Sequence, residues 1–258
     1  MSEQPSTTSP ADAGTTTGSP TTAASAQGPV RPGARPPERL GSTGSTAQDA
    51  VGPVDAVVLD YGNVLYTWDA VGAVAGRVPV ADWDEFVASG EFDRLNAMAD
   101  RGTPFEEILD DLRETHPDRP EWEHLQCLYW EHFADTKTGP VPGTGAIVDE
   151  LLDAGVPLYA LTNFHDVLFE RTRHMVPQLP RFTGIVVSGE EHLAKPEPEI
   201  YRVLLERYGL DASRTLFVDD SPANVEGARA VGMRAHLFVG AGRLRAELTE
   251  RGLLSPRD

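Results

Sequence analysis

Cysteine is nearly absent from the sequence, since Cys127 is the only one among 258 residues. A single thiol excludes an intrachain disulfide, which fits the reducing cytoplasm. The sequence also lacks any run of about eighteen apolar residues, the length that a membrane-spanning helix requires. No apolar stretch follows a basic start at the N-terminus, so the pattern of a secretory signal is missing as well. We therefore expect a cytoplasmic protein without a membrane anchor.

Large apolar side chains are almost missing from the first fifty residues, of which 37 are Ser, Thr, Gly, Ala or Pro. Such a segment cannot bury enough apolar surface to offset the entropy of ordering its backbone. We therefore predict a disordered tail over residues 1–52. The roughly two hundred residues that follow suit one sizeable domain with room for an insertion.

Positive charge is also scarce, because 22 Lys and Arg residues stand against 40 Asp and Glu residues, for a formal net charge of −18. Four of the acids and three of the bases lie among the first fifty residues, so the excess belongs to the folded part. An acidic surface repels nucleic acid and anionic membranes, and we expect neither as a partner. It repels phosphate esters too, so a site for a phosphorylated substrate requires a local cationic group or a bound metal ion.

Five short apolar runs have the pattern of buried β-strands. They are continuous rather than alternating, as is typical of parallel strands covered on both faces. The runs span residues 54–60 (VDAVVLD), 156–163 (VPLYALTN), 184–189 (GIVVSG), 215–220 (TLFVDD) and 234–239 (RAHLFV). Helical patterns at residues 144–154, 197–208 and 223–231 separate the later runs, and a glycine follows each of them. Strands that alternate with helices predict an α/β protein with a doubly wound, Rossmann-like parallel sheet.

One long interval interrupts this alternation, because about eighty residues between the first run and Gly143 contain no strand-like pattern. Residues 83–98 and 105–115 have helical patterns, and the interval carries six large aromatic residues: Trp83, Phe86, Trp122, Tyr129, Trp130 and Phe133. We interpret these aromatic residues as a small hydrophobic core rather than a substrate-binding box. The predicted boundaries are residues 67–138 for a helical insertion, and residues 53–66 and 139–258 for the α/β core.

Polar and charged residues follow three of the predicted strands. Asp60 ends the first strand, Thr162–Asn163 ends the second, and Asp219–Asp220 ends the fourth. Ligands of an open parallel sheet bind outside the carboxyl ends of its strands, where we expect these residues to converge. Lys195 comes just before a helix that begins with prolines, and it would lie near the same edge. Each residue alone has a simpler interpretation as a turn former, a helix cap or a solvated side chain, but together they indicate a functional site.

These segments resemble the four motifs of the haloacid dehalogenase superfamily, in the order in which that family has them. They read LDYGNVL, TN after the second strand, KPEPEIY and VDDSPANVEGA, and the similarity runs from about residue 54 to residue 254. The helical insertion resembles the cap of that superfamily, and the first motif resembles that of phosphatases close to a sugar-phosphate branch. The resemblance implies a Mg²⁺-dependent phosphatase that acts on a small phosphorylated metabolite, with a sugar phosphate as one candidate.

The resemblance also implies a role for each motif. Asp60 would attack phosphorus and form an aspartyl-phosphate, which divides a slow hydrolysis into two easier steps. Asp60, the Asp219–Asp220 pair and the Gly62 carbonyl would hold Mg²⁺, with Asp219 bound directly or through water. Lys195 would neutralise the nucleophile and the phosphoryl group. The Thr162–Asn163 pair would hold the transferring oxygens through the threonine hydroxyl and the asparagine N–H.

One departure from the family pattern concerns the proton donor. Many phosphatases of the superfamily carry a second Asp two residues after the nucleophile as general acid and base, and here that position is Gly62. General acid catalysis contributes about a hundred- to ten-thousand-fold, so its absence predicts slow turnover or a preference for good leaving groups. His165 and Asp69 are candidate substitutes, although a capping role is the simpler interpretation of both.

Two other functions remain open at this stage. A 2-haloacid dehalogenase would tolerate Gly62, because halide needs no proton on leaving, but the Asp219–Asp220 pair is awkward without a cation. A non-catalytic protein that binds a phosphorylated metabolite would also tolerate Gly62. A mere binding protein, however, has no evident need for Asp60.

Overall fold

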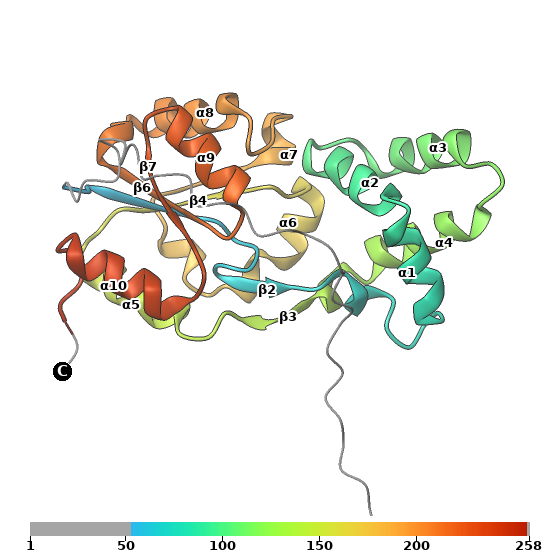
Figure 1. The fold of residues 1–258 in the computed structure, drawn as a ribbon, viewed down its shortest axis with the longest axis horizontal. Coiled ribbons are helices and arrows are strands. Elements are labelled where there is room, and N and C mark those ends of the chain that lie inside the picture. The colour runs from blue at the N-terminus through green and yellow to red at the C-terminus, as the bar shows by residue number, and fades with distance from the viewer. Residues whose placement is uncertain (1–52, 257–258) are drawn as a thin grey trace, which may run out of the picture. The chain divides into compact units, whose positions relative to one another are not determined.

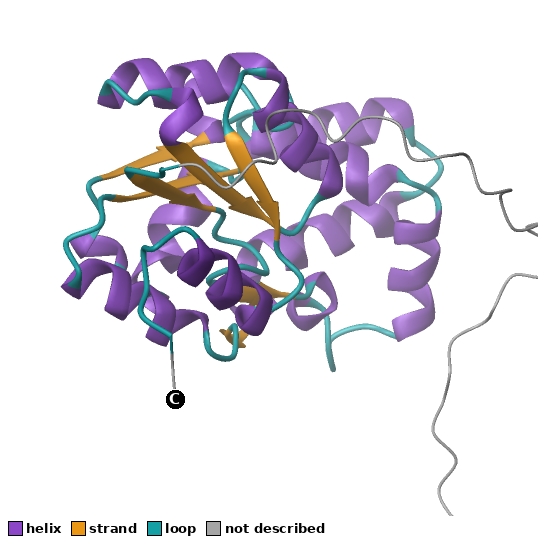
Figure 2. Ribbon diagram, turned by 60° about the vertical axis from the view of Figure 1, so that its left-hand side comes forward, coloured by secondary structure: helices purple, strands orange, loops and turns teal. Residues whose placement is uncertain are grey.

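The structure is a computed structural model that describes residues 53–256, so the tail predicted over residues 1–52 lies outside the described residues. Its main sheet has five parallel strands in the order β5-β4-β1-β6-β7 (Figure 2). The strands are β1 (Ala56–Leu59), β4 (Leu158–Thr162), β5 (Gly184–Val187), β6 (Thr215–Asp219) and β7 (Arg234–Leu237). Each lies within one of the apolar runs, and the predicted fold class is confirmed.

Helices cover both faces of this sheet (Figure 1). They are α5 (Thr144–Asp153), α6 (Asp166–Thr172), α7 (Ser188–Glu191), α8 (Pro198–Tyr208), α9 (Pro222–Ala230) and α10 (Ala241–Glu250). Val57 and Leu59 of β1 share one hydrophobic cluster with α5, α6 and α10, whereas Ala56 and Val58 share another with α8 and α9. Side chains on both faces of β1 are therefore buried, which explains its continuous apolar sequence. Within residues 53–256, no helix combines the length and the apolar character needed to cross a membrane.

The order of the strands determines where a ligand can bind. From β1 the chain passes to β4 and β5 on one side of the sheet, and then returns to β6 and β7 on the other side. The central strand β1 is therefore the point at which the winding changes direction. Parallel sheets leave a crevice at the carboxyl ends of the strands beside such a point. The residues that follow β1, β4 and β6 consequently meet at one place.

The insertion enters and leaves the core through a short antiparallel ribbon of β2 (Tyr66–Trp68) and β3 (Lys137–Pro140). Between these strands lie α1 (Val80–Ala88), α2 (Glu91–Asp100), α3 (Phe105–Thr115) and α4 (Pro120–Glu131), together with the short 3-10 helices η1 (Ala70–Ala73) and η2 (Phe133–Thr136). The boundaries predicted for the insertion at residues 67 and 138 fall within the two strands. The ribbon itself was missed, because strands of three and four partly exposed residues produce no apolar run.

The helix predicted over residues 83–98 is wrong as a single element. It is two helices, α1 and α2, which are separated at Ser89 and Gly90. Gly90 has a φ of 83°, a left-handed conformation that glycine adopts without steric cost and that ends the first helix. The apolar spacing continues through the break because both helices turn their apolar sides to the same cluster, which conceals the turn from a periodicity argument.

Most aromatic residues of the insertion pack against one another, as predicted, but their cluster continues into the α/β core, where Phe133 packs on Phe164. The rings of Trp83, Phe86 and Phe92 contact one another at centroid distances of 4.9–6.1 Å, mostly edge to face. Trp122 packs on Phe86, and Tyr129 packs on Phe92. Edge-to-face aromatic pairs add about 0.5–1.5 kcal/mol beyond the area that they bury. These contacts indicate a cap whose shape does not depend on a bound substrate.

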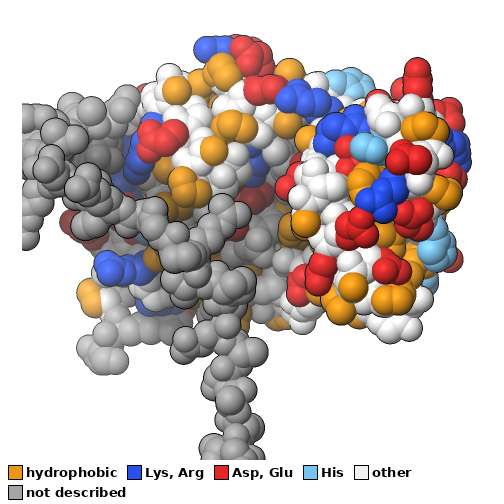
Figure 3. Space-filling view, turned by 45° about the vertical axis from the view of Figure 1, so that its right-hand side comes forward, with side chains coloured by type: hydrophobic (Ala, Val, Ile, Leu, Met, Phe, Trp, Pro, Cys, Tyr) orange, Lys and Arg blue, Asp and Glu red, His pale blue; other side chains and the backbone are white. Residues whose placement is uncertain are grey.

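The outer face of the insertion carries charges of both signs side by side (Figure 3). Arg113 pairs with Glu123 at 2.6 Å, and Arg119 pairs with Glu121 at 3.1 Å. Exposed pairs of this kind contribute about 0–1 kcal/mol each to stability. On this face the acidic side chains are therefore interspersed with arginines rather than gathered into one negative patch.

Replacing Phe86 with alanine is expected to lower the free energy of unfolding by about 3–5 kcal/mol, because the ring is fully buried among aromatic neighbours and its loss leaves a cavity. Chemical denaturation measures this change. Val80→Ala on the same helix is the matched control, since Val80 is 61% exposed and its truncation should cost under about 0.5 kcal/mol. Equal losses for the two variants would contradict the proposed aromatic core.

Candidate active site

Lys195 occupies the centre of the carboxyl edge of the sheet, in the loop between α7 and α8. Its Nζ lies 2.8 Å from Asp60 Oδ1 and 2.7 Å from Asp219 Oδ2. It also donates a hydrogen bond to the Leu161 carbonyl at 3.0 Å. All three partners lie at or next to the carboxyl ends of the adjacent strands β1, β4 and β6. The structure therefore brings residues more than one hundred positions apart in the chain into one buried charge cluster.

Asn163 holds the backbone of this lysine from the end of β4. Its Nδ2 donates to the Lys195 carbonyl at 3.0 Å, and its Oδ1 accepts from the Lys195 N–H at 2.8 Å. A side-chain amide that satisfies both backbone groups of one residue fixes both the position and the orientation of that residue. Asn163 thus positions Lys195, a role of its side chain that the sequence did not indicate. Thr162 beside it is buried and lines a pocket at this edge of the sheet.

Three carboxylates meet at the same edge. Asp60, Asp219 and Asp220 each offer an oxygen atom, and these atoms lie within 4.8 Å of one another. Asp219 is fully buried and accepts hydrogen bonds from the Ser221 N–H at 2.8 Å and from Asn224 Nδ2 at 3.0 Å. The convergence expected from the sequence is therefore present, and Asn224 supports the acidic loop. Asp220 is half-buried and accepts a hydrogen bond from Asn63 at 3.2 Å.

The charges of the cluster strongly affect one another. Burial raises the pKa of Asp60 to about 6, with Lys195 opposing the shift and Asp219 adding to it. Burial also acts to lower the pKa of Lys195, but the nearby carboxylates of Asp60 and Asp219 outweigh it and raise that pKa. The lysine is therefore held in its charged form. A further positive charge near Asp60 would favour the ionised carboxylate that a nucleophile requires.

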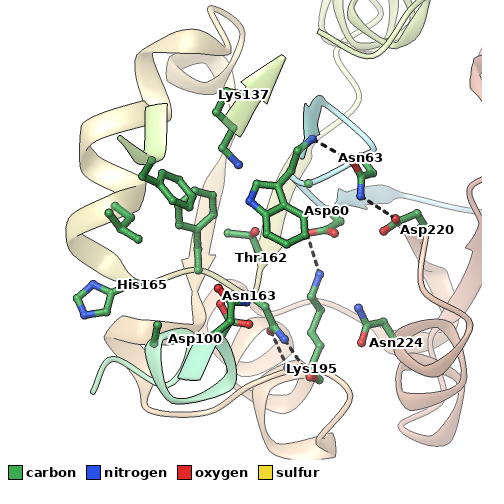
Figure 4. Close-up of a pocket in the computed structure, with 17 residues that line it drawn as sticks. Asp60, Asn63, Asp100, Lys137, Thr162, Asn163, His165, Lys195, Asp220 and Asn224 are labelled. Atoms are coloured by element: carbon green, nitrogen blue, oxygen red, sulfur yellow. Dashed lines mark hydrogen bonds and ion pairs between the residues drawn. The ribbon is translucent and has the colours of Figure 1, made fainter. Parts of the chain in front are cut away.

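A pocket lies between this edge and the cap, and Figure 4 shows the residues that line it. The lining includes Asp60, Thr162 and Lys195 from the core, and Lys137 and Asp100 from the inserted segment. In the view of Figure 4, Asp60 lies between Asp220 on one side and Lys137 with Asp100 on the other. The core and the cap therefore both contribute charged groups to one cavity.

Lys137 is the first residue of β3, and its ammonium lies over three aromatic rings. The distances from Nζ to the ring centroids are 5.1 Å for Tyr61, 5.0 Å for Phe133 and 4.6 Å for Phe164. Burial lowers the pKa of Lys137 to about 7, against the opposing effect of Asp60 and Asp100. Cation–π contacts stabilise the charged form, so this lysine can present positive charge to an anionic substrate. The sequence argument missed it, although Lys137 and Lys195 are the only lysines of the chain.

The two residues considered as substitute acids have structural roles instead. Asp69 caps η1, because its side chain accepts a hydrogen bond from the Val71 N–H. His165 caps α6, with Nδ1 accepting from the Val167 N–H at 3.2 Å and Nε2 lying 3.2 Å from the Thr103 carbonyl. The neutral ring with its proton on Nε2 satisfies these two contacts, and burial lowers the pKa of His165 in favour of that form, whereas the Asp166 carboxylate, 2.8 Å from Nδ1, opposes the shift. His165 is thus a helix cap, as predicted, and its contact with the Thr103 carbonyl also links the core to the cap.

The fold and the site together define a class of protein. Residues 54–232 match the family model of haloacid dehalogenase-like hydrolases, and the chain belongs to this family. The predicted family is therefore confirmed.

Particular members of the family resemble the chain to different extents. It is 30% identical to the Sesquiterpene phosphatase astK of Aspergillus oryzae over 190 residues, which are 69% of this chain and 86% of that protein. It is 31% identical to Phosphatase MT3486 of Mycobacterium tuberculosis over 105 residues, but this match covers 40% of the chain and about half of that protein, 48%. The HAD family enzyme bt-2542 of Bacteroides thetaiotaomicron, solved as a magnesium complex, has the same fold. It has a TM-score of 0.56 at 20% identity, over 74% of this chain and 96% of that chain.

Replacing His165 with asparagine is expected to leave phosphate release from p-nitrophenyl phosphate and from an alkyl phosphate within roughly tenfold of the wild-type rates, because asparagine also caps a helix. His165→Ala should lower the free energy of unfolding by about 1 kcal/mol through loss of the cap. Steady-state assays and denaturation measure the two effects. Selective loss of the alkyl phosphate reaction, by a hundredfold or more, would instead make His165 the proton donor.

Proposed function

We propose that this protein is a Mg²⁺-dependent phosphatase that hydrolyses a small phosphorylated metabolite through an aspartyl-phosphate on Asp60. The supporting observation is the geometry of the charged cluster, in which Lys195 bridges Asp60 and Asp219 while three carboxylates lie within 4.8 Å. The phosphatases among its relatives support the same reaction. A nucleophilic carboxylate, a buried lysine and a group of acids are the parts that phosphoryl transfer to an aspartate requires.

The donor set fits Mg²⁺. Three carboxylates and one ammonium leave two negative charges at the edge of the sheet, which a divalent cation would balance. Asp219 already receives hydrogen bonds from Lys195, Ser221 and Asn224, so we assign it contact through water. Asp60, Asp220 and the Gly62 carbonyl remain as the direct ligands that the family pattern implies. When bound, Mg²⁺ would neutralise phosphate charge as the nucleophile approaches.

The residues of the chain would then act as follows. Asp60 attacks phosphorus while the Lys195 ammonium offsets the repulsion between the carboxylate and the phosphoryl oxygens. The Thr162 hydroxyl and the Asn163 N–H hold the transferring oxygens at the end of β4. The Asn163 side chain meanwhile keeps Lys195 in place. Because Lys195 is buried and already held by Asp60, Asp219 and Asn163, its charge needs little reorganisation during the reaction.

The alternatives are less well supported. A 2-haloacid dehalogenase reaction requires no cation, yet without one the three clustered carboxylates repel one another and burial opposes ionisation of Asp60. A binding protein without activity would have no use for a nucleophile held at 2.8 Å from a buried ammonium. Phosphate hydrolysis accounts for both features.

Replacing Asp60 with asparagine is expected to reduce phosphate release from p-nitrophenyl phosphate to background, because an amide cannot form the aspartyl-phosphate. Chelation with EDTA should also abolish the wild-type reaction, and added Mg²⁺ should restore it. Colorimetric release of p-nitrophenolate measures both effects.

Asp93→Asn is the matched control, since this acid is exposed on α2 and should be replaceable without loss. Circular dichroism checks that the Asp60 variant is folded. Normal turnover by Asp60→Asn would exclude the covalent mechanism. Chloride release from 2-chloropropionate without metal would favour the dehalogenase.

The residues that line the pocket indicate which kind of organic group the substrate carries. Trp68, Phe133, Phe164 and Leu168 form an apolar part of a lining that is otherwise mostly polar or charged, and the half-open space of about 190 Å³ has room for roughly six water molecules. A phosphoryl group with a compact organic part fits such a space. The aromatic part of the wall favours an apolar organic group over a polyhydroxylated sugar, and a sesquiterpene phosphatase is among the relatives.

A short prenyl monophosphate is accordingly expected to be hydrolysed with a higher kcat/KM than hexose phosphates. Phosphate release across a panel with added Mg²⁺ measures this preference. Phe133→Ala should lower the ratio of prenyl to hexose activity, because it removes apolar contact area from one wall. A clear preference for hexose phosphates would instead support the sugar-phosphate branch indicated by the first motif.

A further inference from the structure

The proposed hydrolysis needs a proton donor for the leaving oxygen, and the core residues considered so far do not supply one. Gly62 has no side chain at the position where related phosphatases carry an acid. Both ring nitrogens of His165 are engaged, one by the Val167 N–H and the other at the Thr103 carbonyl. Lys195 is held charged between two carboxylates. A donor must therefore come from another part of the pocket.

The last turn of α2 brings a carboxyl group into the pocket from the cap. Asn96, Ala99 and Asp100 in the last turn of α2 all line the cavity, whereas Phe92, one turn before Asn96, packs among the aromatic residues of the cap. Within residues 53–256, the Asp100 carboxyl has no hydrogen-bond or ion-pair partner. Figure 4 shows Asp100 among the residues that line the pocket. The carboxyl is therefore free to contact a substrate.

The chain around Asp100 is tied closely to the core. Ser188 donates a hydrogen bond to the Asp100 carbonyl, and His192 Nδ1 lies 2.9 Å from the Arg101 carbonyl. At Gly102 a Cβ would lie 2.2 Å from the Gly189 carbonyl oxygen, so only glycine allows this close approach.

Two further contacts hold the same segment against the core. Arg101 pairs with Glu197, two residues after Lys195, and the Thr103 carbonyl accepts from His165. Each residue of the segment 100–103 therefore contacts the core. The Asp100 side chain consequently has a fixed position relative to Asp60, as acid–base catalysis requires.

We propose that Asp100 is the general acid and base of this site, an inference that rests on the proposed phosphatase function. In the first step its carboxyl gives a proton to the ester oxygen as the phosphorus–oxygen bond breaks and the bond from Asp60 to phosphorus forms. In the second step its carboxylate takes a proton from water, as the water oxygen attacks phosphorus and the Asp60–phosphorus bond breaks. Asp100 thereby regains the proton that it gave, and the products are the alcohol and inorganic phosphate.

The surroundings of Asp100 suit both steps. Burial raises the pKa of Asp100 to about 7, an effect that Lys195 opposes and Asp60 reinforces, so near neutral pH both protonation states are accessible. Lys137 is the other titratable cap-side group near the site. Burial lowers the pKa of Lys137 to about 7 as well, so titration alone does not choose between the two groups. The three aromatic rings around the Lys137 ammonium favour its charged form, whereas the Asp100 carboxyl has no hydrogen-bond or ion-pair partner within residues 53–256.

The test compares two leaving groups in the full-length protein with Mg²⁺. Asp100→Asn should lower kcat/KM for an alkyl phosphate by about a hundred- to ten-thousand-fold, because alkoxide is a poor leaving group without a proton. The loss should be far smaller for p-nitrophenyl phosphate, whose leaving group needs no acid. With that substrate the variant should show a burst of p-nitrophenolate, because the water step has lost its base and the phosphorylated enzyme accumulates.

Two further variants separate catalysis from structure. Asp100→Glu keeps a carboxyl and should recover part of the alkyl phosphate activity, whereas Asp93→Asn on the same helix should change neither substrate. An equal loss with both substrates, or no loss with either, overturns the assignment. Failure of the proposed function itself is distinguishable, because the wild type would then release no p-nitrophenolate or Asp60→Asn would remain active.

Discussion

The placement of the Lys195 ammonium between two buried carboxylates is the constraint on which the site depends. Removing an ion from water costs several kcal/mol unless partners replace the hydration, and here Asp60, Asp219 and the Leu161 carbonyl do so. The carboxylates in turn could not be crowded together without a cation. The parallel pairing of β1 with β4 and β6 brings these groups together, and the Asn163 amide fixes the lysine backbone between them. The strand order therefore brings the charged groups together, and their pairing in turn offsets the cost of burying them at this edge.

The chain has only two lysines, and both lie at this pocket in different surroundings. Lys195 is paired with carboxylates, which raise its pKa, whereas Lys137 rests on aromatic rings and burial lowers its pKa. A protein with a net charge of −18 repels an anionic ester at long range, so attraction has to be local. One lysine faces the nucleophile and the other faces the cap side of the same cavity. Both lysines can therefore offset the charge of the phosphoryl group in the proposed substrate.

The parts of the structure that the sequence could predict are those in which local pattern and burial coincide. Parallel strands covered on both faces read as apolar runs, so the sheet and Asp60 at the end of β1 were accessible to prediction. The β2–β3 ribbon and the break at Gly90 were not, because partly exposed short strands and a turn between two amphipathic helices leave no distinct pattern. Asp100 and Lys137 were missed for a different reason. Their importance comes from docking of the cap on the core, and no spacing along one helix or strand reveals it.

The acid that is missing at Gly62 would be supplied by the cap segment 100–103. No neighbouring atom lies within 4 Å of the position that a Gly62 Cβ would occupy, so this place beside the nucleophile is open rather than sterically closed to a side chain. With the acid on α2 instead, the proton donor reaches the site only while the segment 100–103 is docked against Ser188 and Gly189. A phosphatase that keeps its acid on the core can lose cap contacts and still protonate a leaving group. Here the contacts that hold the cap on the core would also hold the proposed general acid at the pocket. Loss of these contacts would therefore remove the proton donor as well as the cover of the substrate.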